Sequence, residues 1–299
     1  MNRSDQVQRI VVGIDGSAQA ARAAAWAAAL AARRDATLHL VHALNLIGPP
    51  SLLTRLSFET YRQHRVKDGE ALLDAVRAQA LVRFPRLWIT TEVAESDPVQ
   101  ALVACSREAR LVVAGTRGHD GFAGLLLGSV ALRLAAHSRC PAVFVPAGFE
   151  QAETGPIGEV VVGVEWGECA EMIDFAFDLA EETGASLRAV HAWEAIPAYN
   201  GYYYIDPATL QAEAQSLLGG ALKVAYETHG ANVRLTADAV RSAPATALLD
   251  AARGARLLVL GAHRRRSALS VGVGPVLHAL LSHPPCPVAV VPATWHQGT

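Results

Sequence analysis

The two halves of the chain repeat one another, and this repeat constrains the fold more than any other feature of the sequence. Four segments recur in the same order, which indicates a duplicated domain of roughly 145 residues. The matched pairs are RIVVGID at 9–15 and EVVVGVE at 159–165, LHLVHA at 38–43 and LRAVHA at 187–192, ARLVVAG at 109–115 and ARLLVLG at 255–261, and CPAVFVP at 140–146 and CPVAVVP at 286–292. A polar stretch containing glycine and proline separates the copies and suits a linker. We therefore expect two domains, residues 1–147 and 156–299.

Within each copy, short apolar runs alternate with longer segments of helical periodicity. This alternation is typical of βαβ units, and because the apolar runs are continuous, both faces of the sheet should be covered. Strands are expected near residues 9–14, 37–43, 87–94, 111–115 and 141–146, and near 159–164, 186–192, 233–239, 256–261 and 287–292. In the first copy, helices are expected over 18–34, 58–84 and 99–108 and from residue 129. The sequence thus predicts two tandem α/β domains, each a doubly wound parallel sheet of the Rossmann-like type.

Composition argues against several classes of protein. The formal net charge is −2, which does not fit the basic surface that nucleic-acid binding requires. The start of the chain lacks a signal-peptide pattern and the most apolar runs are too short to cross a bilayer, so we expect a cytoplasmic protein with neither nucleic-acid nor membrane partners. The four cysteines form no C-x-x-C pair and no histidine stands at zinc-ligand spacing, so the spacing predicts no metal motif. Cys140 and Cys286, each directly before a proline, are expected to be buried.

A glycine-rich loop follows the expected fourth strand. Its pattern is G-x2-G-x9-G-S, formed by Gly115, Gly118, Gly128 and Ser129. Glycines let the backbone approach an anion closely, and the helix that begins at Ser129 would direct its first N–H groups at phosphates. The alternative is an ordinary flexible loop, but the position between a strand and a helix favours a phosphate-binding loop.

A second loop, Asp15-Gly16-Ser17, follows the first strand. Ligands of doubly wound sheets bind beyond the carboxyl ends of the strands, where the strand order reverses. If the first and fourth strands flank that point, this loop and the glycine loop face one another. The Asp15 carboxylate could then hold a ribose, an adenine or a magnesium ion, and the alternative is that Asp15 only caps the helix from Ala18.

Together, VVGIDGS at 11–17, LVHA at 40–43, the glycine loop and CPAVFVP resemble the universal stress protein family, specifically its tandem-domain, ATP-binding members. The resemblance covers both copies. It implies a strand order of 3-2-1-4-5 and ATP between the two loops, with Asp15 near the adenosine and Mg²⁺. It further implies that Val41 meets the adenine through its backbone, that Gly115 approaches the ribose, and that Gly118, Gly128, Ser129 and Val130 bind phosphates.

The second copy departs from this pattern. Glu165 replaces Asp15, Gly167 replaces Ser17, Arg264 replaces Gly118 and Pro275 replaces Ser129, although the spacing of the glycines at 261 and 274 is kept. A proline at the helix start removes an N–H donor, and a long side chain in place of glycine occupies space that a phosphate would need. We therefore expect a degenerate nucleotide motif in the second copy. The run His263–Arg266 is interpreted as a solvated basic loop, with an anion site as the alternative.

The sequence favours binding over catalysis. It contains no P-loop, kinase or hydrolase-elbow motif, and Arg117 is the one Lys or Arg of the glycine loop that could reach phosphates. We expect an ATP-binding regulatory protein and not an enzyme. Two alternatives remain open. One is a nucleotide-independent dimerising scaffold, since the resemblance implies pairing of the two copies and further association into a homodimer. The other is a slow ATPase.

Overall fold

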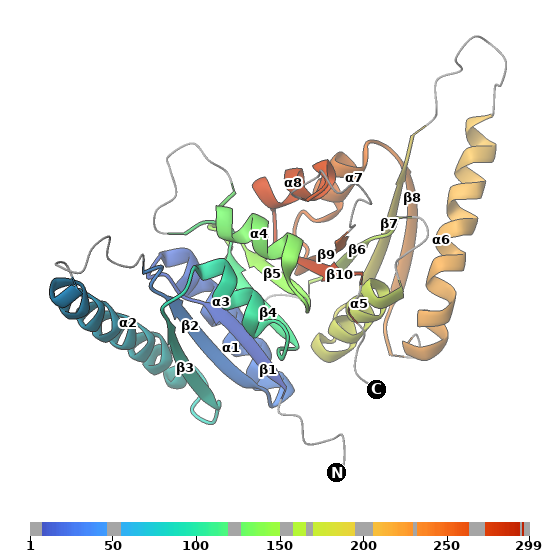
Figure 1. Ribbon diagram of the computed structural model, residues 1–299. Coiled ribbons are helices and arrows are strands. Elements are labelled where there is room, and N and C mark those ends of the chain that lie inside the picture. The colour runs from blue at the N-terminus through green and yellow to red at the C-terminus, as the bar shows by residue number, and fades with distance from the viewer. Residues whose placement is uncertain are drawn as a thin grey trace, which may run out of the picture. The chain divides into compact units, whose positions relative to one another are not determined.

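The computed structural model describes residues 8–46, 55–118, 127–149, 158–165, 170–194, 206–229, 232–262, 273–293 and 295. The chain divides into two compact units, residues 1–151 and 152–299, and each is described separately below (Figure 1).

The first unit is a parallel sheet of five strands with helices between them. Its elements are β1 (Arg9–Gly13), α1 (Ala18–Arg34), β2 (Thr37–Ala43), α2 (Arg55–Arg83), β3 (Ile89–Ala94), α3 (Pro98–Cys105), β4 (Leu111–Gly115), α4 (Ser129–His137) and β5 (Ala142–Val145). The strand order is β3-β2-β1-β4-β5, which confirms the order 3-2-1-4-5.

Helices cover the sheet of the first unit. Helix α1 packs on β1 and β4 and beside α2, whereas α3 packs on β2 and beside α4 (Figure 1). Right-handed crossovers in this strand order place these two helix pairs on opposite faces. The central strands are correspondingly inaccessible, since Val11, Val12, Val112 and Val113 are fully buried. Continuous apolar runs therefore mark strands covered on both faces, as the sequence predicts.

The second unit repeats this architecture. Its elements are β6 (Val160–Gly163), α5 (Ala170–Thr183), β7 (Leu187–Trp193), α6 (Pro207–His229), β8 (Leu235–Arg241), α7 (Pro244–Ala251), β9 (Leu257–Ala262), α8 (Pro275–Ser282) and β10 (Val288–Pro292). The order β8-β7-β6-β9-β10 is again 3-2-1-4-5 within the unit, and the strand pairs are parallel. The predicted fold class is therefore confirmed for both copies.

Most differences from the predicted elements lie at their ends. Helix α3 ends at Cys105 instead of residue 108, where the Ser106 hydroxyl donates to the carbonyl oxygen of Val103 at 2.7 Å. Helix α3 begins at Pro98, one residue before the predicted range, and the side chain of its N-cap Asp97 accepts from the amide of Val99 at 2.9 Å. Strand β8 begins and ends two residues later than expected. Within the described ranges, none of the helices has the length and apolarity needed to span a membrane.

Candidate functional site

The loops that follow β1 and β4 meet at one end of the first sheet. The two strands are neighbours, and the order reverses between them because β2 lies on the other side of β1. A Cβ atom built on Gly118 would lie only 2.6 Å from Oδ2 of Asp15. The structure therefore brings the Asp15 carboxylate against the glycine loop, at the place where doubly wound sheets bind ligands.

The β1 loop has a fixed local geometry. Gly16 has φ of +84°, a backbone conformation that suits glycine. Oδ1 of Asp15 accepts from the amide of Ser17 at 2.9 Å, and Oγ of Ser17 accepts from the amide of Ala20 at 3.1 Å. The N-cap of α1 is thus Ser17 and not Asp15, which removes the interpretation of Asp15 as the helix cap. Asp15 itself is exposed.

The glycines of the β4 loop lie in close packing that leaves little space for a side chain. The Gly128 amide donates to the carbonyl oxygen of Thr116 at 2.8 Å, and a Cβ at Gly128 would lie 3.2 Å from that oxygen. A Cβ at Gly115 would lie 3.0 Å from both the Arg117 carbonyl oxygen and Cβ of Gln19. Residues 119–126 lie outside the described part of the chain. The two described ends of the loop are therefore joined through Thr116.

Helix α4 begins directly after Gly128. Gly128 is its N-cap and provides no side-chain hydrogen bond to the first turn. Ser129 at the first helical position is exposed, and Val130 is half-buried. The first N–H groups of a helix carry partial positive charge and lack partners within the helix. This end of α4 therefore suits an anionic group.

Gln19 is a positioning residue that sequence reasoning missed. Its Oε1 accepts from the backbone amide of Arg117 at 2.8 Å and lies 3.5 Å from the Thr116 hydroxyl. This side chain ties the start of α1 to the β4 loop. A lone amide side chain in the first turn of an alanine-rich helix is the signal that could have found it. In the second copy, Cys169 takes this place in the sequence and lies outside the described residues.

Val41 is a predicted site residue that lies within the sheet, as Gly115 at the end of β4 does. It is 2% exposed, and its carbonyl oxygen accepts from the amide of Ile14 at 2.8 Å. The next residue, His42, donates from Nδ1 to the Ile14 carbonyl oxygen at 2.7 Å, and His191 makes the corresponding bond to Val164 at 2.8 Å. Because a carbonyl only accepts, both Nδ1 atoms carry the proton. His42 and His191 therefore have the same hydrogen-bonded packing role at matched positions of the two copies.

The second unit has a cleft of about 820 Å³ at the corresponding end of its sheet. Three carboxylate side chains line it, and none of its described lining residues is Lys or Arg. Pro275, the first residue of α8, supplies no N–H where Ser129 supplies one in α4. The lining residues include Gly163, Glu165, Trp193, Glu194, Glu213, Gly261, Gly274 and Pro275. Gly167 and the run His263–Arg266 lie outside the described residues, so their predicted roles stay predictions.

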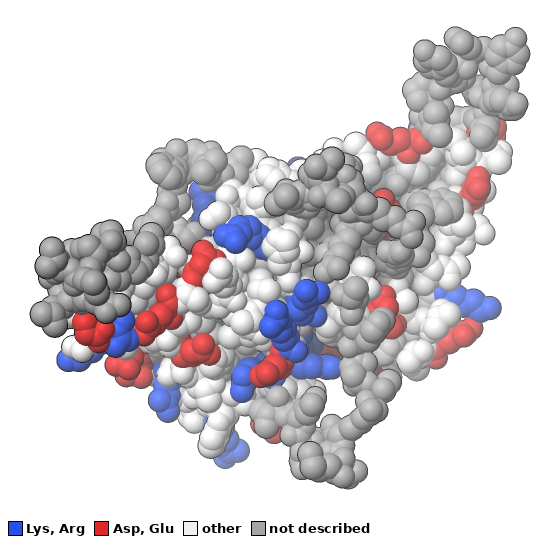
Figure 2. All heavy atoms as spheres, in the orientation of Figure 1, with Lys and Arg blue, Asp and Glu red and all other residues white. Residues whose placement is uncertain are grey.

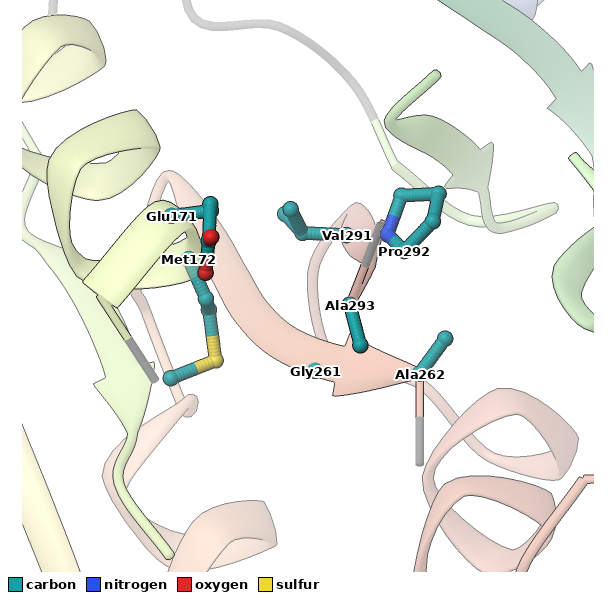
Figure 3. A pocket seen from close by; sticks show the side chains of 7 residues that line it. All are labelled: Glu171, Met172, Gly261, Ala262, Val291, Pro292 and Ala293. Atoms are coloured by element: carbon teal, nitrogen blue, oxygen red, sulfur yellow. The ribbon is translucent and has the colours of Figure 1, made fainter. Parts of the chain in front are cut away.

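A smaller hollow lies beside this cleft, between the start of α5 and the ends of β9 and β10 (Figure 3). Its volume of about 10 Å³ holds one water at most.

Elsewhere, Lys and Arg side chains lie interspersed with Asp and Glu over the visible face of the first unit (Figure 2). Neither feature offers a second place for a nucleotide-sized ligand.

The fold defines a tandem α/β protein whose first sheet brings two loops together at its switch point, where doubly wound sheets bind ligands. The model of the universal stress protein family matches residues 6–146 and 157–292, and the chain belongs to this family. A universal stress protein of Mycobacterium tuberculosis is 29% identical over 97% of this chain and 99% of its own length. Another from the same organism is 30% identical over 89% of this chain and 90% of its own length.

Solved structures agree with the fold. The crystal structure of a universal stress protein from Archaeoglobus fulgidus superimposes with a TM-score of 0.70, covering 95% of this chain and 98% of its own, at 17% identity. A putative universal stress protein from Pseudomonas aeruginosa has a TM-score of 0.56, covering 97% and 95%, at 15% identity. At these identities the likeness concerns the fold alone, and the family assignment rests on the sequence matches.

Proposed function

We propose that the chain is a regulatory ATP-binding protein whose nucleotide binds in the first unit, together with Mg²⁺. The residues proposed to hold it come from both loops, from the end of β2 and from the start of α4. They are Asp15, Gly16, Ser17, Val41, Gly115, Arg117, Gly118, Gly128, Ser129 and Val130, with Asp15 as the metal ligand. Bound ATP would supply a charged triphosphate whose presence or absence biases the conformation of the loops.

The observation that carries the proposal is the approach of the Asp15 carboxylate to Gly118. A carboxylate facing a phosphate-binding loop would repel a bare triphosphate. A divalent cation between them removes this repulsion, because Mg²⁺ binds carboxylate and phosphate oxygens together. The residues present therefore fit ATP with Mg²⁺ better than free ATP, and binding should depend on the metal.

The proposal places the nucleotide in one unit only. In the second unit, the described lining of the cleft combines carboxylates with a proline at the helix start, so it lacks part of the donor set that supports the first site. An acidic cleft disfavours a triphosphate. We infer that the second cleft is retained by the duplicated fold without the phosphate-binding function.

Binding without efficient turnover is the expected activity. Phosphoryl transfer requires groups that stabilise the charge developing on the transferred phosphate. In the glycine loop, residues 115–129, Arg117 is the only Lys or Arg. Its amide is held by Gln19, which positions the loop but adds no further cation. A slow ATPase remains the alternative, and phosphate release that disappears in Asp15→Ala would support it.

A matched pair of glycine substitutions tests the proposal. Gly128→Ala places a Cβ 3.2 Å from the Thr116 carbonyl oxygen, whereas Gly274→Ala, at the corresponding position of the second unit, meets no atom within 4 Å. Titration of ATP with Mg²⁺ into the full chain, followed by calorimetry, should show weaker binding for Gly128→Ala and unchanged binding for Gly274→Ala. No binding to the wild-type chain, or equal effects of the two substitutions, would contradict the proposal.

The scaffold alternative predicts a different result. Sedimentation with and without ATP measures whether the homodimer expected from the resemblance forms and whether it responds to nucleotide. An assembly that is indifferent to ATP, in a chain that binds none, would favour the scaffold over the regulatory nucleotide-binding protein.

A further inference from the structure

A second group of polar side chains lies in the first unit, within the sheet and away from the two loops. His39 lies on β2, Glu92 on the neighbouring β3 and Cys105 at the end of α3, which packs over β2 (Figure 1). Nε2 of His39 and Oε2 of Glu92 are 3.1 Å apart, and one ligand atom from each of the three side chains lies within 4.8 Å of the others. Residues distant in sequence thus provide imidazole, carboxylate and thiol groups at one point.

The imidazole of His39 is already oriented. Its Nδ1 lies 2.7 Å from the hydroxyl oxygen of Thr90, and its Nε2 faces Glu92. Histidines that bind metals commonly donate their second ring N–H to an oxygen, which fixes the ring and selects the coordinating nitrogen. A carboxylate only accepts, so in the metal-free site Nε2 donates to Glu92 and the Thr90 hydroxyl donates to Nδ1. Metal binding to Nε2 moves the ring proton to Nδ1, where the Thr90 oxygen can accept it.

The cluster is partly buried but accessible from one side. His39 is 7% exposed, whereas the Glu92 side chain is 47% exposed and Cys105 is half-buried. Burial raises the pKa of the Cys105 thiol, and the nearby Glu92 carboxylate raises it further, while Arg9 opposes this shift. A free reactive thiolate is therefore disfavoured here, and a divalent cation would reverse the balance because it stabilises the thiolate directly.

The second unit provides an internal comparison. At the positions of His39 and Glu92 it has Arg188 and Asp238, whose Nε and Oδ2 atoms form an ion pair of 2.7 Å. Ala251, the last residue of α7, stands where Cys105 ends α3. A simple ion pair between β7 and β8 therefore meets the structural need at this place in the fold. The first unit instead has three side chains of metal-ligating types, and bridging the strands does not by itself require Cys105.

We propose that His39, Glu92 and Cys105 form a Zn²⁺ site that is separate from the nucleotide crevice. Thiolate and imidazole ligands together with one carboxylate favour Zn²⁺ over Mg²⁺ or Ca²⁺. Binding forms a Zn–S bond and breaks the S–H bond of Cys105, whose proton passes to solvent, while water takes the fourth position. Tetrahedral ligands at zinc bond lengths lie roughly 3.4–3.8 Å apart. Ligand atoms of this group lie within 4.8 Å of one another, so metal binding requires an approach of about 1 Å at most.

Zinc titration of the chelator-treated full chain, in competition with a chromophoric chelator, tests this site. One Zn²⁺ should bind per wild-type chain. Cys105→Ala and His39→Arg should abolish this binding while keeping cooperative unfolding, because they introduce the residues that the second unit uses at these positions. Cys286→Ala, which removes a buried cysteine of the second unit, should bind zinc normally. Substitution with Co²⁺ should give a thiolate-to-metal charge-transfer band that is absent in Cys105→Ala.

Protection from alkylation locates the metal independently. In wild-type protein treated with iodoacetamide at mildly alkaline pH and mapped by mass spectrometry, Zn²⁺ should slow modification of Cys105. In the zinc titration, Thr90→Val should weaken zinc binding about tenfold, because it removes the oxygen that holds the His39 ring. Absence of one-to-one zinc binding by the wild-type chain would overturn the proposal. Zinc binding that persists in both Cys105→Ala and His39→Arg would overturn it as well, because the metal would then lie elsewhere in the chain.

Discussion

Replacing Gly118 with alanine should weaken ATP binding by displacing Asp15. The added Cβ would lie 2.6 Å from Oδ2 of Asp15, at least 0.4 Å closer than real Cβ contacts allow. The carboxylate is the end of a rotatable side chain, so it can turn away, and the backbone of Gly118 has no left-handed φ that alanine would strain. The substitution should therefore leave stability nearly unchanged while removing Asp15 from its place beside the glycine loop.

The size of the effect follows from what Asp15 contributes. An interaction with a charged group contributes about 1.5–3 kcal/mol, so loss of the carboxylate from the site should weaken ATP binding by about ten- to a hundredfold. Asp15→Ala should have a similar effect. Because Asp15→Ala also removes the clash, Gly118→Ala in that background should change the affinity by less than about twofold.

Calorimetric titration of the wild-type chain, the two single variants and the double variant with ATP and Mg²⁺ measures this cycle. Gly148→Ala is the control, since a Cβ at that glycine meets no atom within 4 Å. An unchanged affinity in Gly118→Ala would refute the reasoning. So would penalties of Asp15→Ala and Gly118→Ala that add fully, because independent effects mean that the two loops do not act together.

Three further perturbations have defined outcomes. Gly16 has φ of +84°, so Gly16→Ala should lower the free energy of unfolding by about 1–2 kcal/mol and weaken ATP binding. Gly254 has φ of +76° and open space around it, so Gly254→Ala should lower the free energy of unfolding by a similar amount and leave ATP binding unchanged. Denaturant unfolding and ATP titration measure the two effects. Gln19→Ala removes the acceptor for the Arg117 amide and should speed hydrogen exchange there, while Gln19→Glu, which keeps an acceptor, should not. Burial raises the pKa of Asp174, so its ionised form is penalised in the fold. Asp174→Asn should accordingly raise the unfolding temperature at neutral pH. The gain should vanish in acid, where the wild-type carboxyl is protonated. A gain in unfolding temperature that grows in acid would contradict the raised pKa of Asp174.

Much of the fold could be predicted because the two copies constrain each other. Buried parallel strands give continuous apolar runs such as residues 111–115, and the same runs return in order in the second copy. The start of α3 could also be predicted, because the N-cap Asp97 and the proline after it are adjacent residues that together indicate a helix start. The burial of Cys140 and Cys286 is confirmed, since each is 1% exposed and burial raises the pKa of each thiol to about 12.

The site was less predictable because it depends on contacts across the sheet. The glycine pattern indicated the β4 loop, but nothing in the sequence gives the bond from Gln19 to the Arg117 amide, which joins residues 98 positions apart. The group formed by His39, Glu92 and Cys105 was missed for the same reason. Metal motifs are recognised by short spacing along one segment, whereas these ligands come from two strands and a helix that only the fold brings together.

The amount of nucleotide bound by each chain tests the central claim most directly. Chains purified without added nucleotide, and chains saturated with ATP and Mg²⁺, can be heat-denatured and the released nucleotide quantified by chromatography. The account predicts about one ATP per saturated chain, with less retained by Asp15→Ala and the same amount by Glu165→Ala. Two nucleotides per chain would contradict the assignment of the site to the first unit, and none under either condition would contradict nucleotide binding itself.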